Sequence, residues 1–260
     1  MALLKKHLSY LLWPLFIIIS IFTITFSTTA APHATNTEKG TAEAAALLTW
    51  KASLSNHSQS LLSSWIGSSP CSWIGIACDA SQSVISIYLR SLGLVGTLDK
   101  LKFSSFPGLL NLTLHNNSLF GSIPSHIGNL SQLTYLDLSD NHLSGAIPST
   151  IGQLKCLKWF SIFKNEINGT IPPELGRLSN LQRLFLYGNN IMGSIPREMG
   201  ALTSLLELDI SWNNITGPIP TFIGNYRDLD DNSTNSSSKL SSHSALKSII
   251  TWAYSEPTAA

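Results

Sequence analysis

The sequence predicts an α/β solenoid, built from short repeats that stack side by side rather than from a single globular core. Between Leu109 and Tyr226, a phrase of 24 residues occurs five times without an insertion. An asparagine, a glycine and an isoleucine–proline pair recur in every copy at the same spacing. One such unit cannot bury its apolar side chains alone, so neighbouring copies must share a continuous core.

Each copy reads L-x-x-L-x-L-x-x-N-x-(L/I/M)-x-G-x-I-P, which is the pattern of leucine-rich repeats. The L-x-L alternation predicts a short strand with one buried face. We therefore expect a curved, right-handed leucine-rich repeat solenoid with short parallel strands on its concave face. The glycine before x-I-P permits a positive φ, and the proline directs the outgoing convex segment. A later glycine is expected to end a short helical turn. These later glycines are Gly128, Gly152, Gly176, Gly200 and Gly224.

The repeated asparagine has a structural role in this interpretation. Its short amide tolerates turn geometry and offers donors and an acceptor to backbone groups that would otherwise be unpaired. Stacked copies should form a hydrogen-bonded ladder inside the solenoid. The predicted rungs are Asn117, Asn141, Asn165, Asn189 and Asn213.

The first 31 residues are typical of a secretory signal peptide. Lys5 and Lys6 precede an apolar run over residues 8–26, and small residues follow up to Ala30 and Ala31, where we place cleavage. An uncleaved signal anchor is the alternative, because the run is long enough to cross a bilayer. The chain should therefore enter the secretory pathway. It would then lie in the extracellular space, or at the plasma membrane as part of a receptor.

Residues 32–80 are expected to form an N-terminal cap. A polar linker over 32–40 precedes a helix that begins near Glu43, with Thr41 as the candidate N-cap. The physical task of such a cap is to seal the apolar edge of the first repeat, which would otherwise invite aggregation. A degenerate first repeat follows at Val84, which gives about six repeats over 81–226.

Three cysteines are present in the chain. Cys71 and Cys78 are seven residues apart, which in a secreted chain indicates a disulfide closing a short loop. A metal site would need two further ligands, and no histidine or cysteine cluster lies near them. Cys156 is left over, and a free thiol is favoured over an intermolecular bridge.

The cap motifs carry a more specific resemblance. The stretch E-A-x-A-L-L-x-W-K begins at Glu43, and C-x-W-x-G-I-x-C begins at Cys71. Together with the plant-type repeat, they resemble the extracellular domain of plant leucine-rich repeat receptor-like kinases over Ala42 to Tyr226. The resemblance implies an inner face that binds secreted peptides or co-receptor ectodomains. The chain departs from the family because it shows no C-terminal cysteine-paired cap, membrane span or kinase, so we expect a truncated ectodomain.

Candidate ligand contacts lie on the concave strands, because the buried positions are committed to packing. Repeats four to six place aromatic residues there with an arginine beside them, a combination favoured at binding sites. The alternative is that aromatic residues simply suit strand surfaces. The candidates are Trp159, Phe163, Arg183, Phe185, Tyr187, Asp209 and Trp212.

Glycosylation sequons sharpen this choice, since glycans need exposed sites. Asn111 and Asn116 fall on the concave strand of repeat two, whereas repeats three to six carry no sequon at those positions. Sugars would then shield the second repeat and leave the fourth to sixth open. The expected sites are Asn56, Asn111, Asn116, Asn129, Asn168, Asn214, Asn232 and Asn235.

Composition and motifs argue against several function classes. Charged residues make up 12% of the chain and the formal charge is +1, so nucleic-acid binding is not expected. The sequence contains no phosphate-binding glycine-rich loop, H-E-x-x-H or G-x-S-x-G motif, and its seven histidines are scattered. We therefore expect no enzyme activity, no cofactor and no metal. Residues 227–260 should form a polar, disordered tail.

The sequence thus predicts a non-catalytic extracellular recognition module that binds a secreted peptide or a partner ectodomain in plant signalling or defence. One alternative is a secreted inhibitor of microbial cell-wall hydrolases that resembles polygalacturonase-inhibiting proteins. Those proteins usually have more repeats and a cysteine-capped C-terminus. A third interpretation is a non-functional receptor fragment.

Overall fold

The computed structural model describes residues 36–218 and residue 220, and the structural statements below refer to these residues. The predicted signal peptide and the tail over 227–260 lie outside them, as do Asn232, Asn235 and Gly224. Within the described part, no helix combines the length and the apolar character that a membrane crossing requires.

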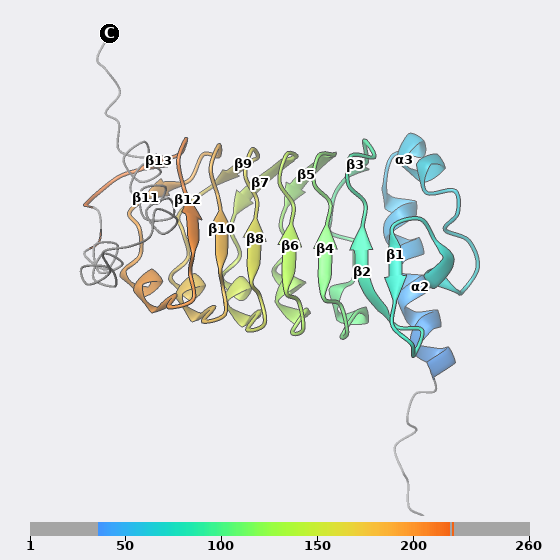
Figure 1. Cartoon of the computed structure of the whole chain (residues 1–260). Coiled ribbons are helices and arrows are strands. Elements are labelled where there is room, and N and C mark those ends of the chain that lie inside the picture. Colours follow the sequence, from blue (N-terminus) through green and yellow to red (C-terminus); the bar gives the residue numbers. More distant parts are fainter. Residues whose placement is uncertain (1–35, 219, 221–260) are drawn as a thin grey trace, which may run out of the picture. The chain divides into compact units, whose positions relative to one another are not determined.

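Seven short strands form one sheet along the solenoid (Figure 1), which we call the concave sheet. Strands β2 to β12 of this sheet pair in parallel and in register, so equivalent residues of successive repeats lie side by side. From β4 to β12, the middle residue of each strand of this sheet is buried in the core. This arrangement confirms the predicted solenoid with parallel strands. In spatial order the strands are β1 (Ile76–Cys78), β2 (Val84–Tyr88), β4 (Asn111–Thr113), β6 (Tyr135–Asp137), β8 (Trp159–Ser161), β10 (Arg183–Phe185) and β12 (Glu207–Asp209).

A second set of parallel strands, which the sequence did not predict, follows the asparagine of each repeat. It lies behind the concave sheet (Figure 1), and the glycine of G-x-I-P falls inside the strand in three repeats and one or two residues after it in two others. That glycine has a φ between 73° and 88° in Gly121, Gly145, Gly169, Gly193 and Gly217, as expected. One sheet contains β3 (Val95–Gly96), β5 (Ser118–Ser122), β7 (His142–Ala146) and β9 (Glu166–Asn168), and β11 (Met192–Gly193) pairs with β13 (Asn214–Ile215).

The convex side consists of short 3₁₀ turns, one in each repeat. The last four begin directly after the proline of the I-P pair, which holds an extended conformation at the N-cap. Their apolar residues Ile127, Ile151, Leu175 and Met199 are buried, as predicted. The turns are η2 (Phe103–Ser105), η3 (Ser125–Asn129), η4 (Ser149–Gln153), η5 (Pro173–Arg177) and η6 (Arg197–Ala201).

The convex glycines were expected to end these turns, but they lie one residue before the last residue of each turn. Gly152 and Gly176 lie inside their turns and are not among the glycines with positive φ. A β-carbon on Gly152 would lie 2.4 Å from the carbonyl oxygen of Glu174, and one on Gly176 would lie 2.1 Å from that of Glu198. Glycine is therefore needed because successive turns pack backbone against backbone.

Replacing Gly176 with alanine should destabilise the solenoid by about 1–3 kcal/mol, because the methyl group overlaps a backbone oxygen that cannot move alone. Gly108→Ala is the matched control, since no atom lies within 4 Å of the β-carbon position there. Urea unfolding followed by circular dichroism measures both variants. An equal loss of stability in the two would contradict the packing explanation.

The N-terminal cap begins earlier than expected. Helix α2 spans Asn36–Ser53, so the predicted linker over 32–40 is helical from Asn36, and Thr41 lies inside the helix rather than at its N-cap. The physical reason is composition, because residues 37–46 are rich in alanine, glutamate and lysine, which are strong helix formers. A short helix α3 (Asn56–Leu61) and a 3₁₀ turn η1 (Pro70–Ser72) complete the cap before β1.

The cap closes the first repeat with apolar rings and with strand pairing. Trp50, Trp65 and Trp73 are buried, and the ring centroids of Trp65 and Trp73 lie 5.6 Å apart. The indole Nε1 of Trp50 donates to the carbonyl oxygen of Thr97 over 2.8 Å. Strand β1 pairs antiparallel with β2 and so covers the edge of the parallel strands. The predicted disulfide between Cys71 and Cys78 is present and links η1 to β1.

Inside the solenoid, each repeated asparagine connects two repeats. The Nδ2 of Asn165 donates to the carbonyl oxygens of Ile162 in its own repeat and Leu138 in the preceding one, over 3.0 and 3.1 Å. Its Oδ1 accepts from the backbone N–H of Leu143 over 2.9 Å. The same hydrogen-bond pattern recurs at the other four ladder asparagines. Among the five, Asn213 alone is half-buried.

Replacing Asn165 with alanine should cost about 3 kcal/mol, since it leaves buried backbone groups of two repeats without partners. Asn190→Ala is the control, because that side chain is exposed and lies one residue after a rung. The midpoint of urea unfolding distinguishes the two variants. If both midpoints shifted equally, the ladder would not be the main source of this stability.

A left-handed residue precedes each ladder asparagine, although the sequence had suggested that the asparagine itself forms the turn. Its φ lies between 50° and 67° in every described repeat. The residue type varies, and a bulky side chain in this region is a conformational outlier. The five residues are Asn116, Asp140, Lys164, Gly188 and Trp212, and Ser91 takes the same conformation before Leu92 in the first repeat.

Candidate functional site

Three columns of side chains lie on the face of the concave sheet that points away from the core, because its core residues alternate with outward ones. On β8, Phe160 is buried in the core, so Trp159 and Ser161 point to the opposite face. The in-register pairing places Trp159 beside Tyr135 and Arg183, and Ser161 beside Asp137 and Phe185. A third column follows two residues later and contains Phe163 and Tyr187.

One row of rings runs across β6, β8 and β10. The ring centroid of Trp159 lies 5.3 Å from that of Tyr135 and 5.2 Å from that of Phe185. The guanidinium carbon of Arg183 lies 5.1 Å from the Trp159 centroid, within the range of a cation–π contact. The Nε of Arg183 also pairs with Glu207 Oε1 over 3.0 Å. Arg183 is therefore held in place from both sides.

A second row of rings lies in the third column. The rings of Phe163 and Tyr187 are stacked, with centroids 4.5 Å apart and planes 6° from parallel. His115 continues this row, with its centroid 5.9 Å from that of Phe163, and its Nδ1 hydrogen bonds with Ser139 Oγ over 2.9 Å. The two rows define a candidate binding surface, which we call the ring face.

The structure brings most of the predicted contact residues together but buries them more than expected. Trp159, Phe163, Arg183, Phe185, Tyr187 and Asp209 are half-buried, because the rings cover one another. Trp212 differs, since its side chain is 73% exposed and its backbone is left-handed. The prediction missed Tyr135 and His115, although the 24-residue spacing places them in the same columns as Trp159 and Phe163.

Polar groups lie between the two rows. Thr113, Asp137 and Ser161 are buried there, and one oxygen of Asp137 accepts from the backbone N–H of Ser139 over 3.1 Å and from its hydroxyl. Asp209 repeats this pattern with Ser211 over 3.0 and 2.6 Å. Two buried donors have no hydrogen-bond partner within the described residues, namely the Oγ of Ser161 and the Nε1 of Trp159.

The electrostatic field on the ring face is acidic. Burial raises the pKa of the Tyr187 hydroxyl above its ordinary value of 10.0, and the charges of Asp209, Asp140 and Asp137 raise it further. Burial likewise raises the pKa of Tyr135, with a further contribution from Asp137. Both tyrosines therefore remain protonated donors at neutral pH. In the described part of the chain, no three acidic, histidine or cysteine side chains are grouped as metal ligands would be.

The raised pKa of Tyr187 predicts a loss of stability in alkali. Because the folded state holds this proton more tightly than the unfolded chain, the stabilisation is fully present below pH 10.0 and is lost as the pH rises through the folded pKa. Thermal unfolding between pH 9 and 12 should show a smaller fall in Tm for Tyr187→Phe, which keeps the ring. An unchanged slope in this variant would show that Tyr187 does not titrate with folding.

The predicted glycosylation sites within the described residues differ in access. Asn111 is half-buried and pairs in register with Tyr135 at the edge of the ring face. The Nδ2 of Asn116 donates to Ser91 Oγ over 2.9 Å. The exposed sequon asparagines are Asn56, Asn116, Asn129, Asn168 and Asn214.

Cys156 is a free, half-buried cysteine between η4 and β8.

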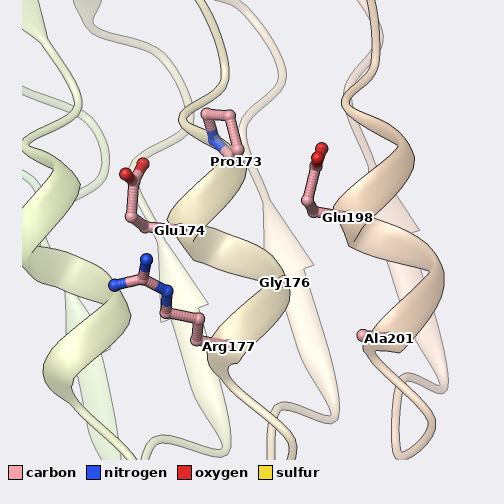
Figure 2. A pocket seen from close by; sticks show the side chains of 6 residues that line it. All are labelled: Pro173, Glu174, Gly176, Arg177, Glu198 and Ala201. Atoms are coloured by element: carbon pink, nitrogen blue, oxygen red, sulfur yellow. The ribbon is translucent and has the colours of Figure 1, made fainter.

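A solvent-open hollow of about 420 Å³ lies on the convex side between η5 and η6 (Figure 2). Glu174 and Arg177 project from η5, and Glu198 projects from η6 on the far side (Figure 2). The Nε of Arg197 reaches Glu198 Oε1 over 3.2 Å, so one carboxylate at the rim is already paired. The hollow contains none of the predicted contact residues. Its lining is Pro173, Glu174, Gly176, Arg177, Glu198 and Ala201.

Comparison with known families agrees with this geometry. Residues 88–230 match the leucine-rich repeat region, and residues 41–79 match the leucine-rich repeat N-terminal domain. The chain belongs to the leucine-rich repeat family. It is 42% identical over 93 residues to the LRR receptor-like serine/threonine-protein kinase RGI3 of Arabidopsis thaliana, a match that covers 35% of this chain and 8% of that kinase.

Solved structures of plant receptor ectodomains share the fold. The ectodomain of the Arabidopsis receptor kinase HAESA, solved with an IDA peptide hormone, matches with a TM-score of 0.65 and 38% identity. That match covers 72% of this chain and 32% of the HAESA chain. The BIR3–SERK2 complex from Arabidopsis thaliana gives a TM-score of 0.59 and 36% identity, covering 66% of this chain and 94% of that chain.

The same fold also carries an unrelated activity. A plant ice-binding protein matches with a TM-score of 0.56 and 28% identity over 69% of this chain and 66% of its own. The fold alone therefore does not determine function, which has to be argued from the side chains on the concave sheet.

Proposed function

We propose that this chain is a non-catalytic extracellular recognition module that binds a peptide or a partner ectodomain on its concave sheet. The ring face is the observation that carries the proposal. Five half-buried phenylalanine, tyrosine and tryptophan rings lie there with an arginine that is fixed by Trp159 and Glu207. Aromatic and arginine side chains that are already ordered lose little entropy on binding, which is why they dominate binding energies.

Two further observations support this function. The HAESA structure was solved with the peptide hormone IDA, and a second HAESA structure also contains the co-receptor SERK1. In addition, the Cys71–Cys78 disulfide fits an oxidising compartment, as expected for a chain that acts outside the cell. The first observation supports the proposed ligand class, and the second supports the proposed location.

The test is binding by the secreted full chain. A panel of synthetic secreted plant peptides and of purified SERK-type ectodomains is titrated by isothermal calorimetry. The double variant Phe185→Ala and Tyr187→Ala should weaken binding at least tenfold, because each ring loses stacked contact area. Trp159→Ala is a poorer probe, since it removes the centre of a ring row and would also destabilise the fold.

The matched control is Tyr88→Ala. Tyr88 occupies the same column as Phe185 on the first repeat, and its side chain is 55% exposed. This variant should bind as the parent chain does. Equal losses in the control and the double variant, or no loss in either, would contradict the proposal.

A further inference from the structure

The two aspartates in the central column of the ring face accept hydrogen bonds from Ser139 and Ser211 but form no ion pair in the described chain, and this points to the chemistry of the ligand. Asp137 on β6 and Asp209 on β12 occupy the central column, and within the described chain neither carboxylate lies in an ion pair. Arg183 is already matched by Glu207, and Lys164 and Asp140 occupy equivalent left-handed positions one residue after the third column. The central column therefore carries negative charge only.

A second observation shows that this surface lacks part of its own hydrogen bonding. Ser161 lies in the central column between Asp137 and Phe185, and its side chain is fully buried with no partner for its Oγ. The Nε1 of Trp159, on the same face of β8, is also without a partner. Buried polar groups without partners are costly, and a ligand that offers both donors and acceptors would satisfy them.

The separation between the carboxylates of Asp137 and Asp209 determines how far apart two ligand side chains must lie to reach both. Strands β6, β8, β10 and β12 are successive neighbours, so Asp137 and Asp209 are separated by three strand spacings, or about 14 Å. An extended peptide advances about 3.3 Å per residue, so side chains four residues apart lie about 13 Å apart on the same side. The rings of Phe163 and Tyr187 lie between the two carboxylates, beside the path of such a peptide.

We infer that the ring face binds an extended basic peptide, with two arginine or lysine side chains four residues apart reaching Asp137 and Asp209. This rests on the proposed function. The three intervening residues contact Phe163 and Tyr187.

The experiment is a selection of randomised twelve-residue peptides by mRNA display on the immobilised, secreted full chain. Selected peptides should be enriched in arginine or lysine at two positions four residues apart. For a selected peptide, Asp209→Asn should weaken binding about tenfold in fluorescence anisotropy, since it removes a charge-assisted hydrogen bond but keeps the side-chain size. Asp137→Asn should do the same at the other basic position.

Two controls distinguish the loss of a specific carboxylate from a change in net charge and from a loss of stability. Asp99→Asn removes one negative charge from an exposed position outside the concave sheet and should leave binding unchanged. Asp209 is half-exposed, so its variant still tests the inference if Asp137→Asn proves unstable. Selected peptides that lack the basic pair, or that bind both aspartate variants normally, would overturn this inference and leave the proposed function intact. An empty selection, together with no binding in the calorimetric panel, would overturn both.

Discussion

The asparagine ladder is the interaction on which the rest of this structure depends. Each amide joins its own repeat to the preceding one through buried backbone groups, so it is satisfied only when neighbouring repeats share one register. A single inserted residue would leave donors and acceptors unpaired in the core, at a cost of about 1–3 kcal/mol for each group. The constant 24-residue spacing follows from that cost, and so do the straight columns of the concave sheet.

The elements that the sequence predicted well are those where one residue type does one job. Asparagine, glycine and proline each occupy a position that few other residues could fill, so the repeat, its parallel strands and its positive-φ glycines could be inferred. The left-handed residue before each rung could not be inferred, because it is asparagine, aspartate, lysine, glycine or tryptophan. The surrounding hydrogen bonds impose the left-handed conformation, and the residue type at this position does not indicate it. The second set of strands was missed because its apolar residue also fits a simple core position.

Most members of the ring face were predicted from the sequence, whereas Tyr135, His115 and the geometry of the rings were not. Register alone brings Trp159, Arg183 and Phe185 together, and register can be counted along the chain. Whether the rings stack on one another or are exposed to solvent depends on the side-chain torsion angles of residues on three strands. The local sequence pattern does not determine these angles. The outcome is a surface of half-buried, mutually supported rings. Such a surface is already ordered before a ligand arrives, which lowers the entropy lost on binding.

The convex glycines have a consequence for the opposite side of the molecule. At Gly152 and Gly176, the turns of adjacent repeats approach so closely that even a β-carbon would overlap a backbone oxygen. A larger residue there would act as a wedge between two repeats, held open at the back while the strand hydrogen bonds persist at the front. The angle between the repeats would then change, and the concave columns would shift relative to one another. Curvature, and with it the fit of a long ligand, could thus be altered by residues that no ligand ever contacts.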